Sequence, residues 1–442
     1  MNRLRLWDES LTSKLIRVLW ILVALVSALS MWFYVGRIWS VGQPEHFSDL
    51  YARWWGAHEL LLHHRDPYGV EVSREIQKVI YGAPLSSSGV DDPQALGGGF
   101  AYPVYVAFLL WPTLWIPYVV VQRCFDVLLP LCTFLSLLLW LRALNWRPHV
   151  SQFVTVSLFV LGSFPSLQGA KLQNLSLLVA FLIAATVAAL AADRLVIAGI
   201  TLAIATIKPQ FVFLLALWLC AWALHDWKNR QRFVWSFGLT MVLLVGAGEL
   251  IAPGWIPRFL HVARAYREYT FGHSVLDLWF TPRIGVFIAA GLTFGVAKLC
   301  WDKIAGSAYS SAFVMATIAV LATTVTVIPT LEPHAQLLLM PAFLFLLAHS
   351  QRILGLGKKV RLLVAAGWAL PAWSWIATTA LALAALWSLP ATLHRFWLIP
   401  LYSSPLIPVA VLLLFLILLA HSDRLLEQRT STAASFSSLA SQ

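Results

Sequence analysis

The segment from His46 to Trp55 reads H-F-S-D-L-Y-A-R-W-W and lies just after the first hydrophobic run of the chain. It opens a polar stretch that continues to about Gly99. An acidic residue a few positions beyond a membrane exit, among aromatic residues, is placed to meet a lipid-borne substrate at the interface. We therefore expect the other polar points of the chain to gather around Asp49.

The composition is that of a membrane protein. Of the 442 residues, 60% are hydrophobic and 12% are charged, whereas a soluble domain has about 25% charged residues. Helices are the default spanning element, because the backbone must satisfy its own hydrogen bonds in lipid. The sequence thus predicts an all-α polytopic bundle.

The net charge of +11 has an ordinary explanation. Lysine and arginine gather in short loops between apolar runs, as the positive-inside bias requires, so nucleic-acid binding is not expected. The four cysteines lie in or beside apolar runs and form no C-x-x-C pair. They predict neither a disulfide framework nor a zinc site.

The basic N-terminus predicts that the first helix, Val18–Val35, is retained and starts in the cytoplasm. Residues 37–99 then form a first extracytoplasmic loop, in which Asp49–Leu62 has the pattern of an amphipathic helix lying on the membrane. We expect one transmembrane domain over residues 1–429, with about 12 spans and both ends cytoplasmic. The Ser/Thr/Ala-rich tail, residues 430–442, is predicted to be disordered in the cytoplasm.

Counting spans leaves one ambiguity. Basic segments at Lys228–Arg232, Lys298–Lys303 and Arg352–Arg361 are expected in the cytoplasm, which places a second long loop, residues 253–282, outside. Counting backwards from Lys228 also puts Lys208 and Gln173 outside. Counting forwards gives the opposite if Phe100–Pro117, which three prolines interrupt, is a full span. The sequence leaves open whether that run crosses or is re-entrant.

Two acidic points have both a functional and a structural interpretation. Asp49 is either a general base or part of the N-cap of the helix that follows it. Glu332 and His334 interrupt an apolar stretch at a helix boundary. Ionisable groups at such depth are costly and usually pair or function, but the two flanking prolines also make an ordinary turn.

Two basic points are similarly open. Lys208 precedes Pro209 at a break between apolar runs, where a lysine either meets a phosphate or extends toward water from a helix end. The segment 258–269 is basic although it is expected outside. Arg258 and Arg264 either bind a lipid phosphate there, or the loop is long enough to escape the charge bias. Walker, H-E-x-x-H and G-x-S-x-G motifs are absent from the sequence.

In their order, these motifs resemble those of polytopic GT-C glycosyltransferases, most closely glycosyltransferase family 87. The resemblance extends from about Asp49 to Pro341. Two positions depart from the family pattern: Val104 stands for a second proline, and Leu172 for the glycine of G-Q-N. The matching pieces are Asp49-Leu50-Tyr51, Asp66-Pro67-Tyr68, Tyr102-Pro103-Val104, Leu172-Gln173-Asn174, Lys208-Pro209-Gln210 and Glu332-Pro333-His334.

The resemblance implies transfer of a sugar, mannose being the family's best-known case, from a polyprenyl-phosphate carrier to a lipid or glycan acceptor. Transfer would invert the anomeric carbon at the extracytoplasmic face of the plasma or inner membrane, and the product would be a cell-envelope glycan. Asp49 would be the general base, and no metal or cofactor is expected. The candidate substrate-binding residues are Tyr51, Arg53, Asp66, Tyr102, Gln173, Asn174, Lys208, Gln210, Arg258, Arg264, Glu332 and His334.

Other functions remain compatible with the same polar points. A transporter or flippase for a lipid-linked sugar would share the broken helices and basic loop, but would not need a base in the first loop. An oligosaccharide ligase would use a preassembled glycan on a pyrophosphate carrier. A non-catalytic scaffold would use neither donor.

Overall fold

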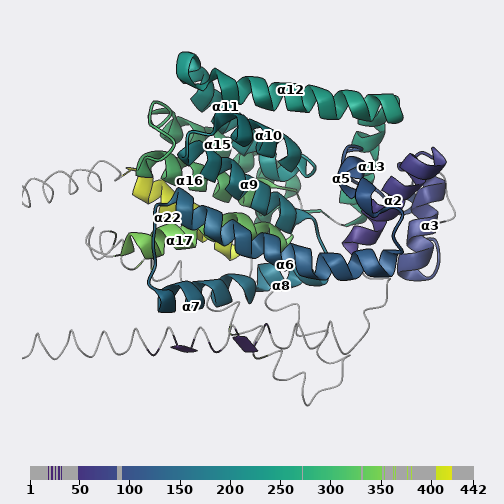
Figure 1. Cartoon of the computed structure of the whole chain (residues 1–442), viewed down its shortest axis with the longest axis horizontal. Helices are drawn as coiled ribbons and strands as arrows, with labels where there is room; N and C mark the ends of the chain where they lie inside the picture. The colour runs from purple at the N-terminus through teal and green to yellow at the C-terminus, as the bar shows by residue number, and fades with distance from the viewer. Residues whose placement is uncertain are drawn as a thin grey trace, which may run out of the picture.

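The computed structural model describes residues 48–86, 92–270, 272–329, 332–350 and 405–420, with a few isolated positions elsewhere. Every regular element within these ranges is a helix (Figure 1), which confirms the all-α class. The expected first helix, the basic segment at residues 352–361 and the tail at 430–442 lie wholly or largely outside the described residues.

The elements follow one another closely along the chain. They are α2 (Asp49–His63), α3 (Val70–Tyr81), α4 (Pro93–Leu96), α5 (Val106–Leu110), η2 (Trp111–Thr113), α6 (Tyr118–Ala143), α7 (Val150–Leu161), α8 (Phe164–Lys171), α9 (Ser176–Ala191), α10 (Leu195–Ala205), α11 (Pro209–His225), α12 (Trp227–Ile251), α13 (Trp255–Tyr269), α14 (Val275–Trp279), α15 (Pro282–Trp301), α16 (Ser311–Val327), η3 (Pro333–Leu339), α17 (Met340–Ala348) and α22 (Leu406–Ala420).

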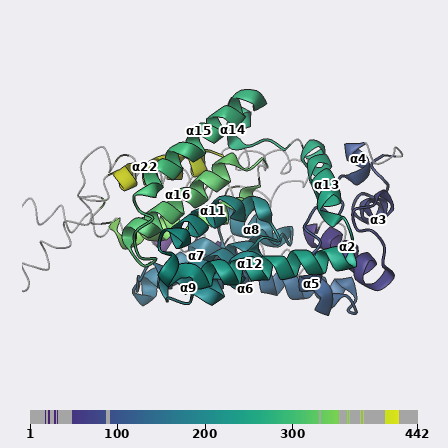
Figure 2. The same ribbon diagram turned by 90° about the horizontal axis from the view of Figure 1, so that it is seen from above.

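The bundle has a body and a smaller group of helices at one end. In the body, α9 packs against α6 and α10, α10 packs against α12, and α16 packs against α22. Helices α2, α3 and α13 gather at one end, on the right in both views (Figures 1 and 2), and α4 packs against α3 and α13 there (Figure 2). The polar segments after the first hydrophobic run and after α12 therefore meet beside the bundle.

Three of the described helices, α6, α12 and α15, are long and apolar enough to cross a membrane. A fourth span results if α7 and α8, which meet at a bend of 49°, count together. The other apolar helices are shorter than the roughly 20 residues of a straight span. The fold is thus that of a helical membrane protein, and the expectation of about 12 spans stays a prediction.

A glycine allows the close packing of α10 on α12. A Cβ at Gly199 would lie 2.7 Å from the Phe233 carbonyl oxygen and 2.7 Å from the Phe237 nitrogen. Both are backbone atoms of α12, so a side chain there would force the two helices apart. Small residues at such contacts are typical of helix pairs in membranes, where close backbone approach drives association.

Three polar segments are described in more detail by the structure than by the sequence. The Phe100–Pro117 run contains only α5, of five residues, and η2, of three, so it does not cross as a helix. Helix α2 was expected to lie on the membrane, but it is buried on most sides, including Arg53 and Glu59. The expected 253–282 loop contains two helices, α13 and α14.

Candidate active site

Asp49 occupies the first position of α2, and the neighbouring serine performs the capping. The Ser48 side-chain oxygen accepts from the Leu50 nitrogen at 3.1 Å, as an N-cap residue does. The Asp49 carboxylate accepts a hydrogen bond from Asn174 Nδ2 at 2.6 Å. Since Asp49 is only partly buried, its carboxylate is held by the protein and still accessible from outside.

The turn between α8 and α9 holds the start of α2 in place. The Asp49 nitrogen donates to the Leu172 carbonyl oxygen at 2.8 Å. The side chain of Gln173 accepts from Ser48 Oγ at 2.5 Å and donates to Asp126 Oδ1 on α6 at 2.5 Å. Gln173 is therefore a tether between α6 and α2, with a left-handed backbone at φ 50°.

Asn174 joins Asp49 to a second polar group. Its Oδ1 accepts from the Ser176 nitrogen at 2.9 Å, from Ser176 Oγ at 2.6 Å and from Lys208 Nζ at 3.4 Å. Its Nδ2 donates to Asp49, so one amide side chain contacts both the acid and the lysine. Lys208 Nζ also donates to Ser176 Oγ at 2.6 Å.

Lys208, Glu332 and His334 form a buried ionic cluster. Lys208 Nζ and Glu332 Oε2 make an ion pair, and His334 Nε2 lies 2.9 Å from the same Oε2. Burial acts to raise the pKa of Glu332, but the charge of Lys208 and the bond to His334 outweigh it and hold that pKa well below its ordinary range. The Glu332 carboxylate is therefore ionised and compensates the charge of Lys208.

Arg53 supplies a second buried cation close to Asp49. Its NH1 donates to the Asp49 carbonyl oxygen at 2.8 Å, and its guanidinium carbon lies 4.6 Å from the centre of the Tyr102 ring. Burial acts to lower the pKa of Arg53, whereas Tyr102, Asp49 and Tyr266 raise it, and the net pKa lies above the ordinary value. Tyr266, on α13, interacts electrostatically with Asp49, Arg53 and Glu332, so α13 contributes to the same site.

Two buried polar atoms of this site have no hydrogen-bond partner among the described residues. They are Arg53 Nε and His334 Nδ1. A buried donor or acceptor without a partner is costly, and at a site such atoms are available to a bound substrate. His334 is held there by close packing, because a Cβ at Gly169 would come within 3.0 Å of the His334 Cβ.

The structure also places three other residues that were predicted to bind substrate. Asp66 pairs with Arg258 at 2.7 Å, which fixes the α2–α3 turn to α13. Tyr51 lies among aromatic rings and makes an edge contact with Tyr118 at 4.9 Å between ring centres. Arg264 is exposed on α13.

The remaining candidates are placed as follows. Tyr102 stacks under the Arg53 guanidinium, as described above, and its carbonyl oxygen accepts from Tyr68 of the D-P-Y motif at 2.8 Å. Gln210 is half-buried in the first turn of α11. Around Asp49, the described residues include no group of three metal-ligating side chains. The group with that geometry, His58, Glu59 and His63, lies further along α2.

Several contacts of the site were not expected from the sequence. Ser48 caps α2 and also accepts from the Tyr118 hydroxyl at 2.8 Å. Asp126 pairs with Arg123 at 3.7 Å and also accepts from Gln173. Tyr266 was not singled out, although its position in a basic, aromatic segment between two spans was a usable signal.

The chain was also compared with known families and proteins. The family model described as Glycosyltransferase family 87 matches residues 100–350. No curated protein and no solved structure matches the chain. The matched region carries Asn174, Lys208, Glu332 and His334, whereas Asp49 lies before it. Since the match covers more than half of the 442 residues, this chain belongs to glycosyltransferase family 87 and is a glycosyltransferase with membrane helices.

Proposed function

We propose that the protein transfers a sugar from a polyprenyl-phosphate carrier to a lipid or glycan acceptor, with inversion and with Asp49 as the general base. The observation that carries the proposal is the placement of the Asp49 carboxylate. This carboxylate does not cap the helix, because Ser48 does. It accepts a hydrogen bond from Asn174 Nδ2 at 2.6 Å and lies close to buried cations. A base of this kind must be fixed in position yet reachable by the acceptor.

The reaction is a single displacement at the anomeric carbon. Asp49 accepts the proton of the acceptor hydroxyl while that oxygen bonds to the anomeric carbon. The bond from this carbon to the phosphate oxygen breaks, and polyprenyl phosphate leaves with one more negative charge. Attack from the face opposite the leaving group inverts the anomeric centre.

The leaving phosphate needs fixed positive groups. Lys208 is a weaker candidate than the sequence suggested, because Glu332 compensates its charge. Arg258 is likewise paired, with Asp66. Arg53, with an unpartnered Nε, and His334, with an unpartnered Nδ1, are the better candidates to contact phosphate oxygens. In this proposal Lys208 and Glu332 position Asn174 and His334.

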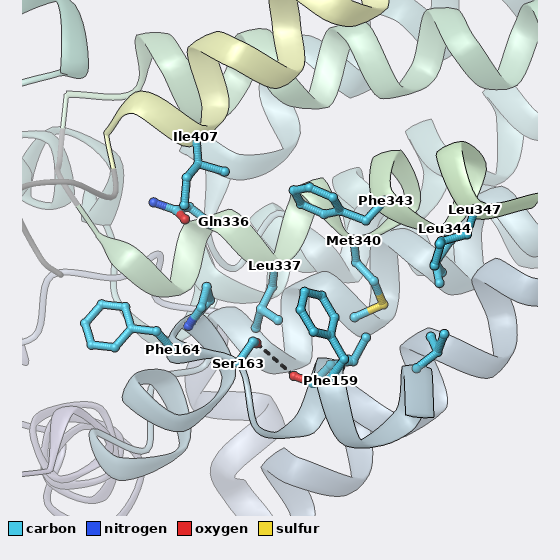
Figure 3. Close-up of a pocket in the computed structure, with 13 residues that line it drawn as sticks. Phe159, Ser163, Phe164, Gln336, Leu337, Met340, Phe343, Leu344, Leu347 and Ile407 are labelled. Atoms are coloured by element: carbon cyan, nitrogen blue, oxygen red, sulfur yellow. Dashed lines mark hydrogen bonds between the residues drawn. The ribbon is translucent and has the colours of Figure 1, made fainter. Parts of the chain in front are cut away.

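A nearby apolar cavity supports a lipid-borne donor. It has a volume of about 70 Å³ and lies between α7–α8 and η3–α17 (Figure 3). Its lining is almost entirely apolar and includes Phe159, Leu337 and Met340. Gln336 and Leu337 belong to η3, which begins beside Glu332, so an apolar chain leaving the site along η3 would meet this cavity.

The contacts of Asp49 also bear on topology. Asp49 bonds to Asn174, which therefore lies at the same membrane face, so an even number of crossings separates them. Helix α6 and the bent pair α7–α8 supply two, provided that Phe100–Pro117 does not cross. Lys208 and Glu332 then lie on that face as well. The positive-inside bias favours the extracytoplasmic side for it, in the plasma or inner membrane.

Purified protein supplied with radiolabelled polyprenyl-phosphate monosaccharide and membrane acceptors tests the proposal. Asp49→Asn keeps the shape and the hydrogen bond of the side chain but removes the base. We expect transfer to fall by at least about 100-fold, the lower range for general-base catalysis, while donor binding persists. Undiminished transfer by Asp49→Asn would refute the role of the base.

The same assay separates the other functions. A flippase would move the donor across vesicles equally well in wild type and Asp49→Asn, and would label no acceptor. A ligase would transfer a pyrophosphate-linked oligosaccharide but not the monosaccharide. Labelling of single cysteines introduced in α3 from one side of sealed vesicles tests the sidedness, and labelling from the cytoplasmic side would overturn it.

A further inference from the structure

The far end of α2 carries a compact group of three potential metal ligands. His58 Nδ1 and His63 Nδ1 each lie 3.1 Å from Glu59 Oε1. The Glu59 side chain is 4% exposed, whereas that of His63 is 54% exposed. Two imidazole nitrogens and one carboxylate oxygen therefore face a common point that opens toward the outside on the His63 side.

The separation of these atoms suits a small transition-metal ion. All three ligand atoms lie within 4.8 Å of one another. Tetrahedral zinc, with bonds of about 2.0 to 2.1 Å, holds neighbouring ligand atoms about 3.3 Å apart. The two 3.1 Å separations are already close to that value. The third, between the two imidazole nitrogens, is at most 4.8 Å, a distance that side-chain rotation can close. Imidazole ligands favour zinc, nickel and copper over magnesium and calcium.

A second layer of contacts fixes the carboxylate in the orientation that a metal needs. Arg65 NH1 donates to Glu59 Oε2 at 2.7 Å and leaves Oε1 facing the imidazoles. The carboxylate is thus oriented, as a metal ligand with outer-shell support must be.

The local charge balance also favours a dication. Arg65 forms ion pairs with Glu59 at 2.7 Å, with Glu75 at 2.7 Å and with Glu71 at 3.7 Å. Three carboxylates thus surround one guanidinium, an excess of two negative charges in this group. A bound M²⁺ ion between neutral imidazoles cancels that excess.

We propose that His58, Glu59 and His63 form a binding site for a transition-metal dication of the Zn²⁺ class. The site lies ten residues from Asp49, about 15 Å along a helix, so the ion does not take part in sugar transfer. The bound ion would link side chains of the last two turns of α2. Arg65, which pairs with Glu59 and with Glu75, would connect this link to α3. The inference stands whether or not the proposed transfer reaction is correct.

Zinc binding to the purified full-length protein, after removal of any affinity tag and of metal by a chelator, tests this proposal. We expect saturable binding of a single Zn²⁺ ion and a rise in the thermal unfolding temperature that Mg²⁺ does not reproduce. His63→Ala should weaken Zn²⁺ binding by at least about 100-fold, because it removes one of three ligands. Since His63 is more than half exposed, this variant should fold like the wild type.

His225→Ala is the matched control. His225 is an exposed histidine in the last turn of α11, as His63 is in the last turn of α2. It should bind Zn²⁺ like the wild type. Equal Zn²⁺ binding by wild type and His63→Ala, or an unfolding temperature that Zn²⁺ leaves unchanged, would mean that the three side chains only hydrogen-bond to one another, and the proposal would be overturned.

Discussion

Removal of the Lys208 charge separates a structural role from a chemical one. Lys208 is 3% exposed and pairs with Glu332, whose side chain is 18% exposed. Truncating one partner of a buried pair leaves the other charge uncompensated, at a cost of about 3 to 5 kcal/mol. Because Glu332 retains some solvent contact, we expect Lys208→Met to lower the free energy of unfolding by about 3 kcal/mol, the lower end of that range.

The double variant Lys208→Met/Glu332→Gln removes both charges and keeps an acceptor for His334. Replacing both partners of a buried pair is often nearly neutral, so most of the lost stability should return. If Lys208 and Glu332 position Asn174 and His334, as we propose, transfer should stay impaired in the double variant, because the amide of Asn174 loses its contact with Lys208.

Thermal unfolding in detergent, followed by tryptophan fluorescence, measures the first effect. At about 2 °C per kcal/mol, the single variant should unfold roughly 6 °C lower. Lys228→Met is the matched control, since Lys228 is exposed at the start of α12, and it should unfold within about 1 °C of wild type. If Lys208→Met unfolds at the same temperature as Lys228→Met, the buried pair does not contribute to stability as we argue. Full transfer by Lys208→Met/Glu332→Gln would refute the role of the pair at the site.

Three further predictions follow from other contacts. Asn174→Ala should leave donor binding within a few-fold of wild type and lower the rate of transfer, since Asp49 loses its 2.6 Å donor; an unchanged rate would show that this bond does not position the base. Gly199→Val should destabilise the fold by about 1 to 3 kcal/mol through overpacking against α12, whereas Gly246→Val, on α12 with open space around it, should not, and equal effects would contradict the close approach. Because the pKa of Glu332 is lowered in the fold, its ionisation stabilises the protein fully above the ordinary carboxyl range and loses that effect as the pH falls toward the folded-state pKa. Glu332→Gln should therefore flatten the acid side of the curve of unfolding temperature against pH, and an unchanged curve would exclude Glu332 as the group responsible.

Local signals in the sequence were enough to locate the elements that carry the site. A serine before a helical pattern marked the start of α2, which the structure places at Asp49 with Ser48 as its cap. A polar residue before a proline marked the breaks at Lys208 and Glu332, and helices begin at both following prolines. Such signals are readable from sequence because each depends on backbone chemistry within a few residues.

Contacts between distant segments were beyond the same reasoning. The Lys208–Glu332 pair joins residues 124 apart in the chain, and the Asn174–Asp49 bond joins residues 125 apart. Nothing local in the sequence says that Lys208 pairs with Glu332, and its predicted role as a phosphate ligand stays a prediction. By contrast, the helical pattern of α13 is local: Trp255, Val262 and Ala265 share an apolar spacing, and all three are buried. The charge pattern of the segment predicted a loop, but the structure forms a helix there.

The helix ends at these residues add positive partial charge to the site, beyond the charges of the side chains. Asp49, Lys208 and Glu332 stand at the N-terminal ends of α2, α11 and η3, and Asn174 lies just before α9. Since the four side chains contact one another in series, the N-terminal ends of these helices converge. The N-terminal end of a helix carries a partial positive charge from its backbone dipoles. In the reaction that we propose, these dipoles would stabilise the leaving phosphate even though Glu332 compensates the charge of Lys208.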